Sequence, residues 1–229
     1  MLNLIEISRL LSHKFHVTEN LIFYGIFSSL VCCLGILYDS NSTVLGSMLV
    51  SPFPIPVLAG INNLLKGNNK ELFKNFKSFI FLWFIVYVSA FIIGFLNEFT
   101  GYFKLPTKQM NSFTKMTRIT TELLTSALGG GIISYAEEID DYVSMAGVSL
   151  ILTMLPPLVN GGLLHGIYFY EHINNTIKII NKEEEITKKK DIVKKGNTSL
   201  LMSAINIAFT FLGGLIIKHQ IRQGRLVNM

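Results

Sequence analysis

Long stretches without a charged side chain constrain the fold of this sequence more than any other feature. The stretch from Ser40 to Leu65 carries no charge, and other apolar runs alternate with short charged segments along the chain. About 20 apolar residues cross a bilayer as one α-helix. Within lipid, only helices and closed barrels satisfy all their backbone hydrogen bonds. The sequence therefore predicts an all-α, polytopic membrane protein.

The composition also agrees with that of a membrane protein. Of 229 residues, 50% are hydrophobic and only 15% are charged, whereas soluble domains carry about 25% charged residues. The net charge is +5, but the lysines lie between apolar runs, where they can face lipid headgroups. We therefore expect the lipid bilayer as partner, with anionic lipids at the Lys-rich loops, and no nucleic acid. A homo-oligomer is left open, and the sequence does not indicate which membrane the chain enters.

The apolar runs divide the chain into two similar halves. An interfacial helix is expected at residues 1–19 and a C-terminal tail at 218–229. Between them we expect a first transmembrane repeat at 20–97 and a second at 119–217. The six expected spans lie at about 20–38, 43–65, 78–97, 119–136, 142–170 and 197–217.

The fourth expected span, 119–136, is the weakest. Only residues 123–136 lie between Glu122 and Glu137, and three adjacent glycines stand at the centre. The segment is expected either to cross the bilayer or to be re-entrant. With six spans the positive residues divide almost evenly between the two sides. With a re-entrant segment, the positive-inside rule places the N-terminus in the cytoplasm.

The second and fifth expected spans resemble each other. In "GSMLVSPFPIPVLAG" (46–60) and "GVSLILTMLPPLVNG" (147–161), a proline and a glycine follow the first glycine after 10 and 14 residues. Each segment stands between two plain spans, and two such triplets run through a membrane in opposite directions. Paired broken helices in inverted repeats are a known architecture of membrane transporters. We therefore expect Pro-broken second and fifth helices in two inverted three-helix repeats, although prolines also kink helices for packing alone.

Polar residues beside the two proline clusters are the candidate site. A broken helix frees backbone carbonyls, and carbonyls with hydroxyls suit a dehydrated cation or a small polar solute. Asn41 and Asn206 are candidate polar contacts within the bundle. The acidic residues at 137–141 are expected to form a solvated turn, and the run at 182–195 a charged surface helix. The candidate substrate-binding residues are Ser51, Pro52, Pro56, Thr153, Pro156, Pro157 and Asn160.

Three segments resemble motifs of the prokaryotic hydrophobic proteins classed as domain of unknown function 389. They are "NSTVLGSMLVSPFPIP" (41–56), "TRITTELLTSALGGGIISYA" (117–136) and "AGVSLILTMLPPLVNGGLL" (146–164). The resemblance covers about residues 20–217 and implies a six-span integral membrane fold. The family has no settled biochemical activity, so the resemblance implies none for this chain. Ala146 stands where the family usually has a proline.

Two functions are compatible with these patterns. The first is a transporter or channel for a small ion or polar solute, with its site between the two broken helices. The alternative is a structural or accessory membrane protein that does not transport. A transporter needs a polar cavity at residues 51–56 and 153–160, whereas a structural protein would pack that region with Phe53 and Leu155. The sequence has no nucleotide-binding loop, metal-ligand spacing or catalytic triad, so we expect no enzyme, cofactor or metal.

Overall fold

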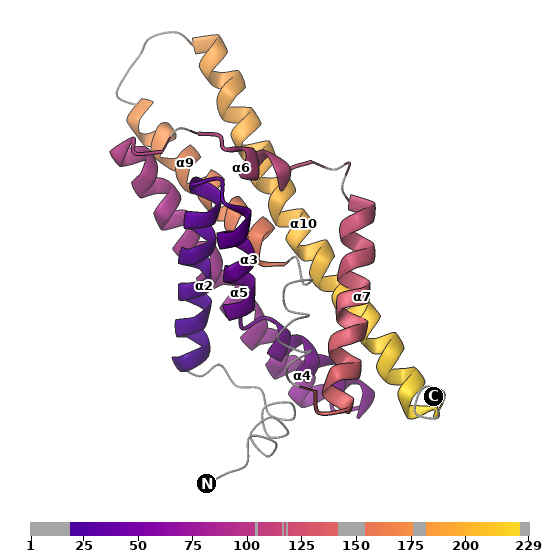
Figure 1. Cartoon of the computed structure of the whole chain (residues 1–229). Helices are drawn as coiled ribbons and strands as arrows, with labels where there is room; N and C mark the ends of the chain where they lie inside the picture. The colour runs from indigo at the N-terminus through magenta and orange to yellow at the C-terminus, as the bar shows by residue number, and fades with distance from the viewer. Residues whose placement is uncertain are drawn as a thin grey trace.

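The structure is a computed structural model, and it describes residues 19–103, 105–115, 117, 119–141, 154–175 and 182–224. Within these ranges the chain forms helices and connecting turns only, which confirms the all-α prediction. The helices form an elongated bundle (Figure 1). The interfacial helix expected at 1–19 and the first part of the fifth span, 142–153, lie outside the described residues, except for Glu19.

The first half of the chain contains α2 (Glu19–Leu37), α3 (Asn41–Val50), α4 (Pro54–Leu65) and α5 (Asn69–Thr100). Ser40 caps α3, because its side chain accepts a hydrogen bond from the backbone N–H of Thr43. The axes of α3 and α4 differ by 46° across the short break between them. The prediction of a Pro-broken second helix is therefore confirmed.

The second half contains α6 (Lys108–Ser112), α7 (Ile119–Glu138), α9 (Leu155–Asn175) and α10 (Lys182–Arg222). The charged run at 182–195 is helical, as expected, but it continues directly into the last apolar segment. α10 is thus 41 residues long, or about 60 Å, roughly twice the hydrocarbon thickness of a bilayer. The helix also continues to Arg222, beyond the expected start of the tail at residue 218.

Several helices are suited to a membrane by length and composition. α2, α5 and the Lys190–Arg222 part of α10 qualify alone, and α3 with α4 qualifies as one bent span, so the described residues hold three or four candidate spans. α7 and α9 are outside this set, and six spans remain a prediction.

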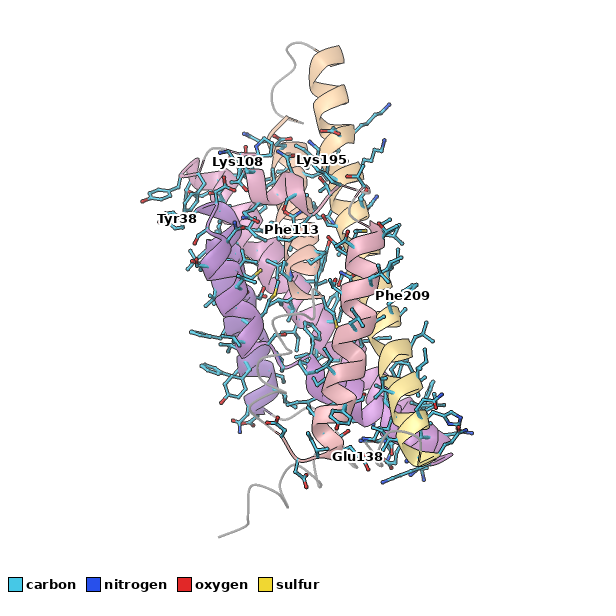
Figure 2. All side chains as sticks on the ribbon, turned by 45° about the vertical axis from the view of Figure 1, so that its right-hand side comes forward. Tyr38, Lys108, Phe113, Glu138, Lys195 and Phe209 are labelled. Atoms are coloured by element: carbon cyan, nitrogen blue, oxygen red, sulfur yellow. The ribbon has the colours of Figure 1, made fainter. Side chains whose placement is uncertain are left out.

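The outer surface of the bundle is strongly apolar. Phe23 on α2 is 63% exposed and Phe73 on α5 is 61% exposed. Figure 2 shows many side chains projecting outward along the helices. Large exposed apolar areas of this kind mark a surface that contacts lipid or another apolar partner. The chain therefore has the surface of a membrane protein.

Glycines allow two helix pairs to pack backbone against backbone. A Cβ atom added at Gly130 on α7 would lie 1.9 Å from the carbonyl oxygen of Thr210 on α10. A Cβ atom at Gly94 on α5 would lie 2.2 Å from the carbonyl oxygen of Leu163 on α9. Small residues at such contacts are typical of helix pairs in membranes.

Candidate functional site

The first proline cluster lies in the break between α3 and α4. α3 ends at Val50, and the N–H of Ser51 bonds to the carbonyl of Met48 at 3.2 Å. Pro54 is the first residue of α4 and Pro56 the third. N–H groups in the first turn of a helix have no intrahelical partner, so prolines there cost no hydrogen bond. Ser51 is half-buried, while Pro52 and Pro56 are buried.

The second proline cluster lies in the first turn of α9. This helix begins at Leu155, so Pro156 and Pro157 are its second and third residues. Pro157 therefore has the same position in α9 that Pro56 has in α4. Both prolines of this cluster are buried. Thr153, the remaining candidate of this cluster, lies outside the described residues.

The helices α4 and α9 begin at a similar level along α5. The ring of Phe53, in the first break, contacts the ring of Phe79 at 5.7 Å between centroids. α9 runs parallel to α5, with Gly162 against the backbone of Tyr87. Counting back along both helices places Leu155 at the level of residue 80. The starts of α4 and α9 thus lie at a similar level, about ten residues, or ~15 Å, after the start of α5.

Apolar side chains fill the region where α4 and α9 begin. Phe53, Met154 and Leu155 are 2%, 1% and 1% exposed. All three belong to the main core cluster of the bundle. The packing around these three side chains is therefore dense and apolar.

Asn160 joins three helices through a buried polar cluster. Its side-chain nitrogen donates to the carbonyl of Met110 on α6 at 3.1 Å and to the hydroxyl of Ser199 on α10 at 2.9 Å. The Ser199 hydroxyl donates to the carbonyl of Phe113 at 3.3 Å. Asn160 is fully buried, and its Oδ1 accepts no hydrogen bond within the described part of the chain. The cluster therefore offers one free acceptor among several oxygens.

The inner face of α10 carries a row of buried polar residues at helical spacing, namely Ser199, Ser203, Asn206 and Thr210. The Ser203 hydroxyl donates to the carbonyl of Met154 at 3.0 Å, just before α9 begins. Asn206 donates to Oε2 of Glu122 on α7 at 3.4 Å. Asn206 thus lies inside the bundle. Sequence reasoning missed the two serines, although their spacing of four residues could have shown that they share a face.

Asn41 lies at the surface rather than among the buried polar groups. It is the exposed first residue of α3, and its side-chain oxygen accepts a hydrogen bond from Gln109. The backbone N–H of Gln109 also donates to Asp39 at 2.7 Å. These contacts attach the start of α6 to the turn between α2 and α3.

A charged cluster connects three helices at the end of the bundle where α10 ends. Asn62 on α4 donates to Oε1 of Glu137 on α7 at 2.8 Å, and Lys218 on α10 forms an ion pair with Oε2 of the same carboxylate. The Lys218 side chain is 7% exposed and that of Glu137 16%. Glu137 is thus part of an interhelical contact, while Glu138 (Figure 2) is exposed. Burial and two nearby cations lower the pKa of Lys66, in the turn after α4.

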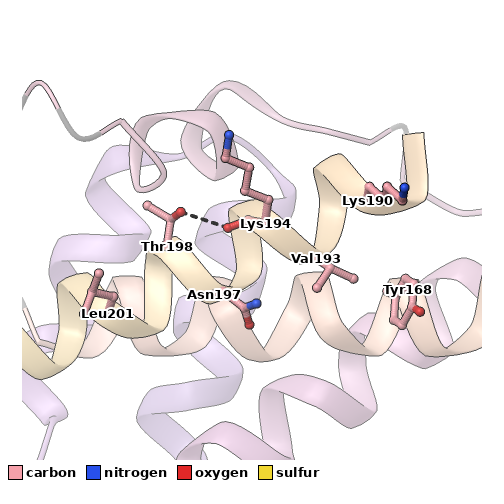
Figure 3. A pocket seen from close by; sticks show the side chains of 7 residues that line it. All are labelled: Tyr168, Lys190, Val193, Lys194, Asn197, Thr198 and Leu201. Carbon is pink, nitrogen blue, oxygen red and sulfur yellow. Dashed lines mark hydrogen bonds between the residues drawn. The ribbon is translucent and has the colours of Figure 1, made fainter. Parts of the chain in front are cut away.

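Two grooves are open on the surface of the bundle. One, of about 620 Å³, lies between α9 and α10 (Figure 3) and has Lys190 and Lys194 on its rim. The other, of about 630 Å³, lies between α4, α5 and α10 and includes Pro56. Among the residues that the structure describes, no group of His, Cys, Asp or Glu could hold a metal ion.

The profile of one protein family matches residues 48–212, which include both proline clusters and the Asn160 cluster. The chain belongs to the family described as Domain of unknown function (DUF389). The resemblance seen in the sequence motifs is thereby confirmed. Neither the search of curated proteins nor that of solved structures gave a match. Membership of DUF389 therefore supplies a relationship but no activity.

Proposed function

We propose that this DUF389 protein is a transporter or channel for a small ion or polar solute, with its site where α4 and α9 begin. One observation carries the proposal: both helices begin at a similar level along α5, each with a proline as its third residue. Helix ends inside a bilayer expose backbone groups that only protein or a water-filled cavity can satisfy.

The proposal includes six spans in two inverted repeats. α7 is one uninterrupted helix of 20 residues, or about 30 Å, which is long enough to cross the hydrocarbon layer. Its Glu122 carboxylate lies against Asn206 of α10, so this charge has a protein partner. In Figure 1, α2 and α7 run in opposite directions, as do α5 and α10, and inverted repeats would have this arrangement.

The groups near these two helix starts define the solute that would be bound. The end of α3 carries partial negative charge, and the starts of α4 and α9 carry partial positive charge. Ser51, Asn160 and the carbonyl of Met154 add neutral oxygens. These groups suit a dehydrated ion or a small polar solute. The proposal requires neither an enzymatic step nor a cofactor, and its partner is the lipid bilayer.

The burial of Phe53 and Leu155 favours the alternative, a structural or accessory membrane protein. Under the transport proposal, the same packing is a closed state in which these side chains must move to admit solute. The two functions therefore differ in whether this region ever opens to water.

Flux measurements on purified protein in liposomes test the proposal. A panel of cations, anions and small metabolites would be assayed with the parent, Ser51→Ala, Asn160→Leu and the control Ser89→Ala. The hydroxyl of Ser89 bonds within α5, to Val86. We expect flux of at least one solute, a loss of about tenfold in the two site variants, equivalent to about 1.4 kcal/mol, and no loss in the control. Absence of flux across the panel, or equal losses in all three variants, would contradict the proposal.

A further inference from the structure

The groove between α4, α5 and α10 has mostly apolar walls and opens on the outer surface of the bundle. Its volume is about 630 Å³, within the range of small-molecule sites. Phe76, Phe79, Ile207 and Phe211 form much of its wall. Phe76 is 58% exposed, so this part of the wall faces the surroundings of the bundle. An occupant of the groove must therefore be largely apolar.

The wall contains two asparagines among its apolar residues: Asn69 is exposed, whereas Asn75 is only 2% exposed. Neither the side-chain nitrogen nor the side-chain oxygen of Asn75 has a hydrogen-bond partner within the described part of the chain. A buried amide without partners costs free energy. The amide in the wall of this groove therefore needs a ligand with a hydrogen-bonding group.

The depth of Asn75 indicates which group could reach it. Asn75 is in the second turn of α5, six residues after Asn69, or ~9 Å along the helix. Each interfacial region of a bilayer is ~5–8 Å thick. If the start of α5 lies at the headgroups, Asn75 lies close to the glycerol esters of a phospholipid.

One lysine lies beside the groove wall, and two more are exposed on the same part of α5. Nζ of Lys77 lies 4.8 Å from the centre of the Phe73 ring, which is part of the groove wall. Lys70 and Lys74 on the same turns of α5 are exposed, and Lys74 is paired with Glu71. Lysines at this level attract anionic headgroups, each contributing about 1 kcal/mol, or about fivefold in affinity.

We infer that this groove binds one chain of an anionic glycerophospholipid. The amide of Asn75 donates to an ester carbonyl, and the headgroup lies beside Lys70 and Lys77. This binding site does not depend on the proposed transport, because it uses the outer face of the bundle rather than the starts of α4 and α9.

The single tryptophan of the chain is a reporter for this site. Trp83 lies on α5 one turn beyond Phe79 of the groove wall. Its fluorescence would be measured in bilayers containing phosphatidylglycerol or phosphatidylcholine with brominated acyl chains. We expect brominated phosphatidylglycerol to quench more strongly at equal mole fraction, with about a fivefold preference. Equal quenching by the two lipids would overturn the proposal.

Matched variants locate the preference within the groove. Lys77→Gln should lose most of the preference for phosphatidylglycerol, whereas Lys194→Gln, at the other end of the bundle, should keep it. Ala208→Phe fills the groove and should abolish the preference, whereas Leu212→Phe on the same helix should not. Retention of the preference in Ala208→Phe, or its loss in Leu212→Phe, would overturn the site.

The amide contact has a separate readout. Native mass spectrometry of purified protein counts phosphatidylglycerol molecules that remain bound after extraction. Asn75→Leu should lower this retention about fivefold, the size of one net hydrogen bond. Retention equal to that of the parent would overturn the assignment of Asn75 as the ester contact.

Discussion

The packing of α7 against α10 through Gly130 gives a prediction whose size follows from the structure. A Cβ atom at Gly130 would lie 1.9 Å from the carbonyl oxygen of Thr210. Because the obstacle is backbone, no side-chain rotation relieves the clash. The helices must move about 1.5 Å apart to restore ordinary contact. Gly130→Ala should therefore destabilise the protein by about 1–3 kcal/mol, as for other overpacked sites.

Gly46 on α3 is a matched control for this substitution. A Cβ atom at Gly46 meets nothing within 4 Å. Gly46→Ala should therefore stabilise the helix by about 0.5–1 kcal/mol, because alanine loses less backbone entropy than glycine. The two variants should differ by about 1.5–4 kcal/mol, or ~3–16 °C in the midpoint of thermal unfolding for a chain of this size.

A fluorogenic maleimide measures both midpoints on purified protein in detergent. Cys32 and Cys33, which are 0% and 1% exposed, are the only thiols in the chain and should react only on unfolding. An unfolding midpoint of Gly130→Ala equal to or above that of Gly46→Ala would show that α7 and α10 do not pack at this distance.

Two further predictions concern the charged cluster and the prolines. Lys218→Gln should lower stability by about 3 kcal/mol in the maleimide assay, because it leaves the largely buried Glu137 carboxylate without its cation. The double variant with Glu137→Gln should regain most of this loss, and a double variant as unstable as the single would be contrary evidence. Pro56→Ala and Pro157→Ala should both remain folded and reduce flux in liposomes, with a combined effect that departs from additivity by more than ~0.5 kcal/mol. Additive losses would show that the two prolines do not share one site.

The sequence predicted the parts of the fold that depend on local pattern. Prolines that cannot continue a helix predict the break near Pro52. The structure places Pro54 and Pro56 in the first turn of α4, and Pro156 and Pro157 in the first turn of α9. The all-α class follows from the long uncharged runs. Both predictions needed only neighbouring residues.

Contacts between distant helices could not be predicted in this way. Asn62 and Glu137 are 75 residues apart in sequence, and nothing in the acidic turn indicates that one of its carboxylates pairs with α4 and α10. The contact of Asn160 with α6 depends on a short helix that lies between two expected spans. Asn75 precedes the expected span at 78–97, so its burial beside an apolar groove also escaped prediction.

The labelling of two engineered cysteines tests the central claim of two opposed repeats most directly. Lys70 is in the first turn of α5 and Lys190 is near the start of α10, and both are exposed. Lys70→Cys and Lys190→Cys would be treated with a membrane-impermeant maleimide in sealed vesicles of one orientation, where the buried native thiols should stay unreactive. We predict that the two positions react from opposite faces of the membrane. Labelling of both from the same face would contradict six spans and remove the basis for a site shared by two inverted repeats.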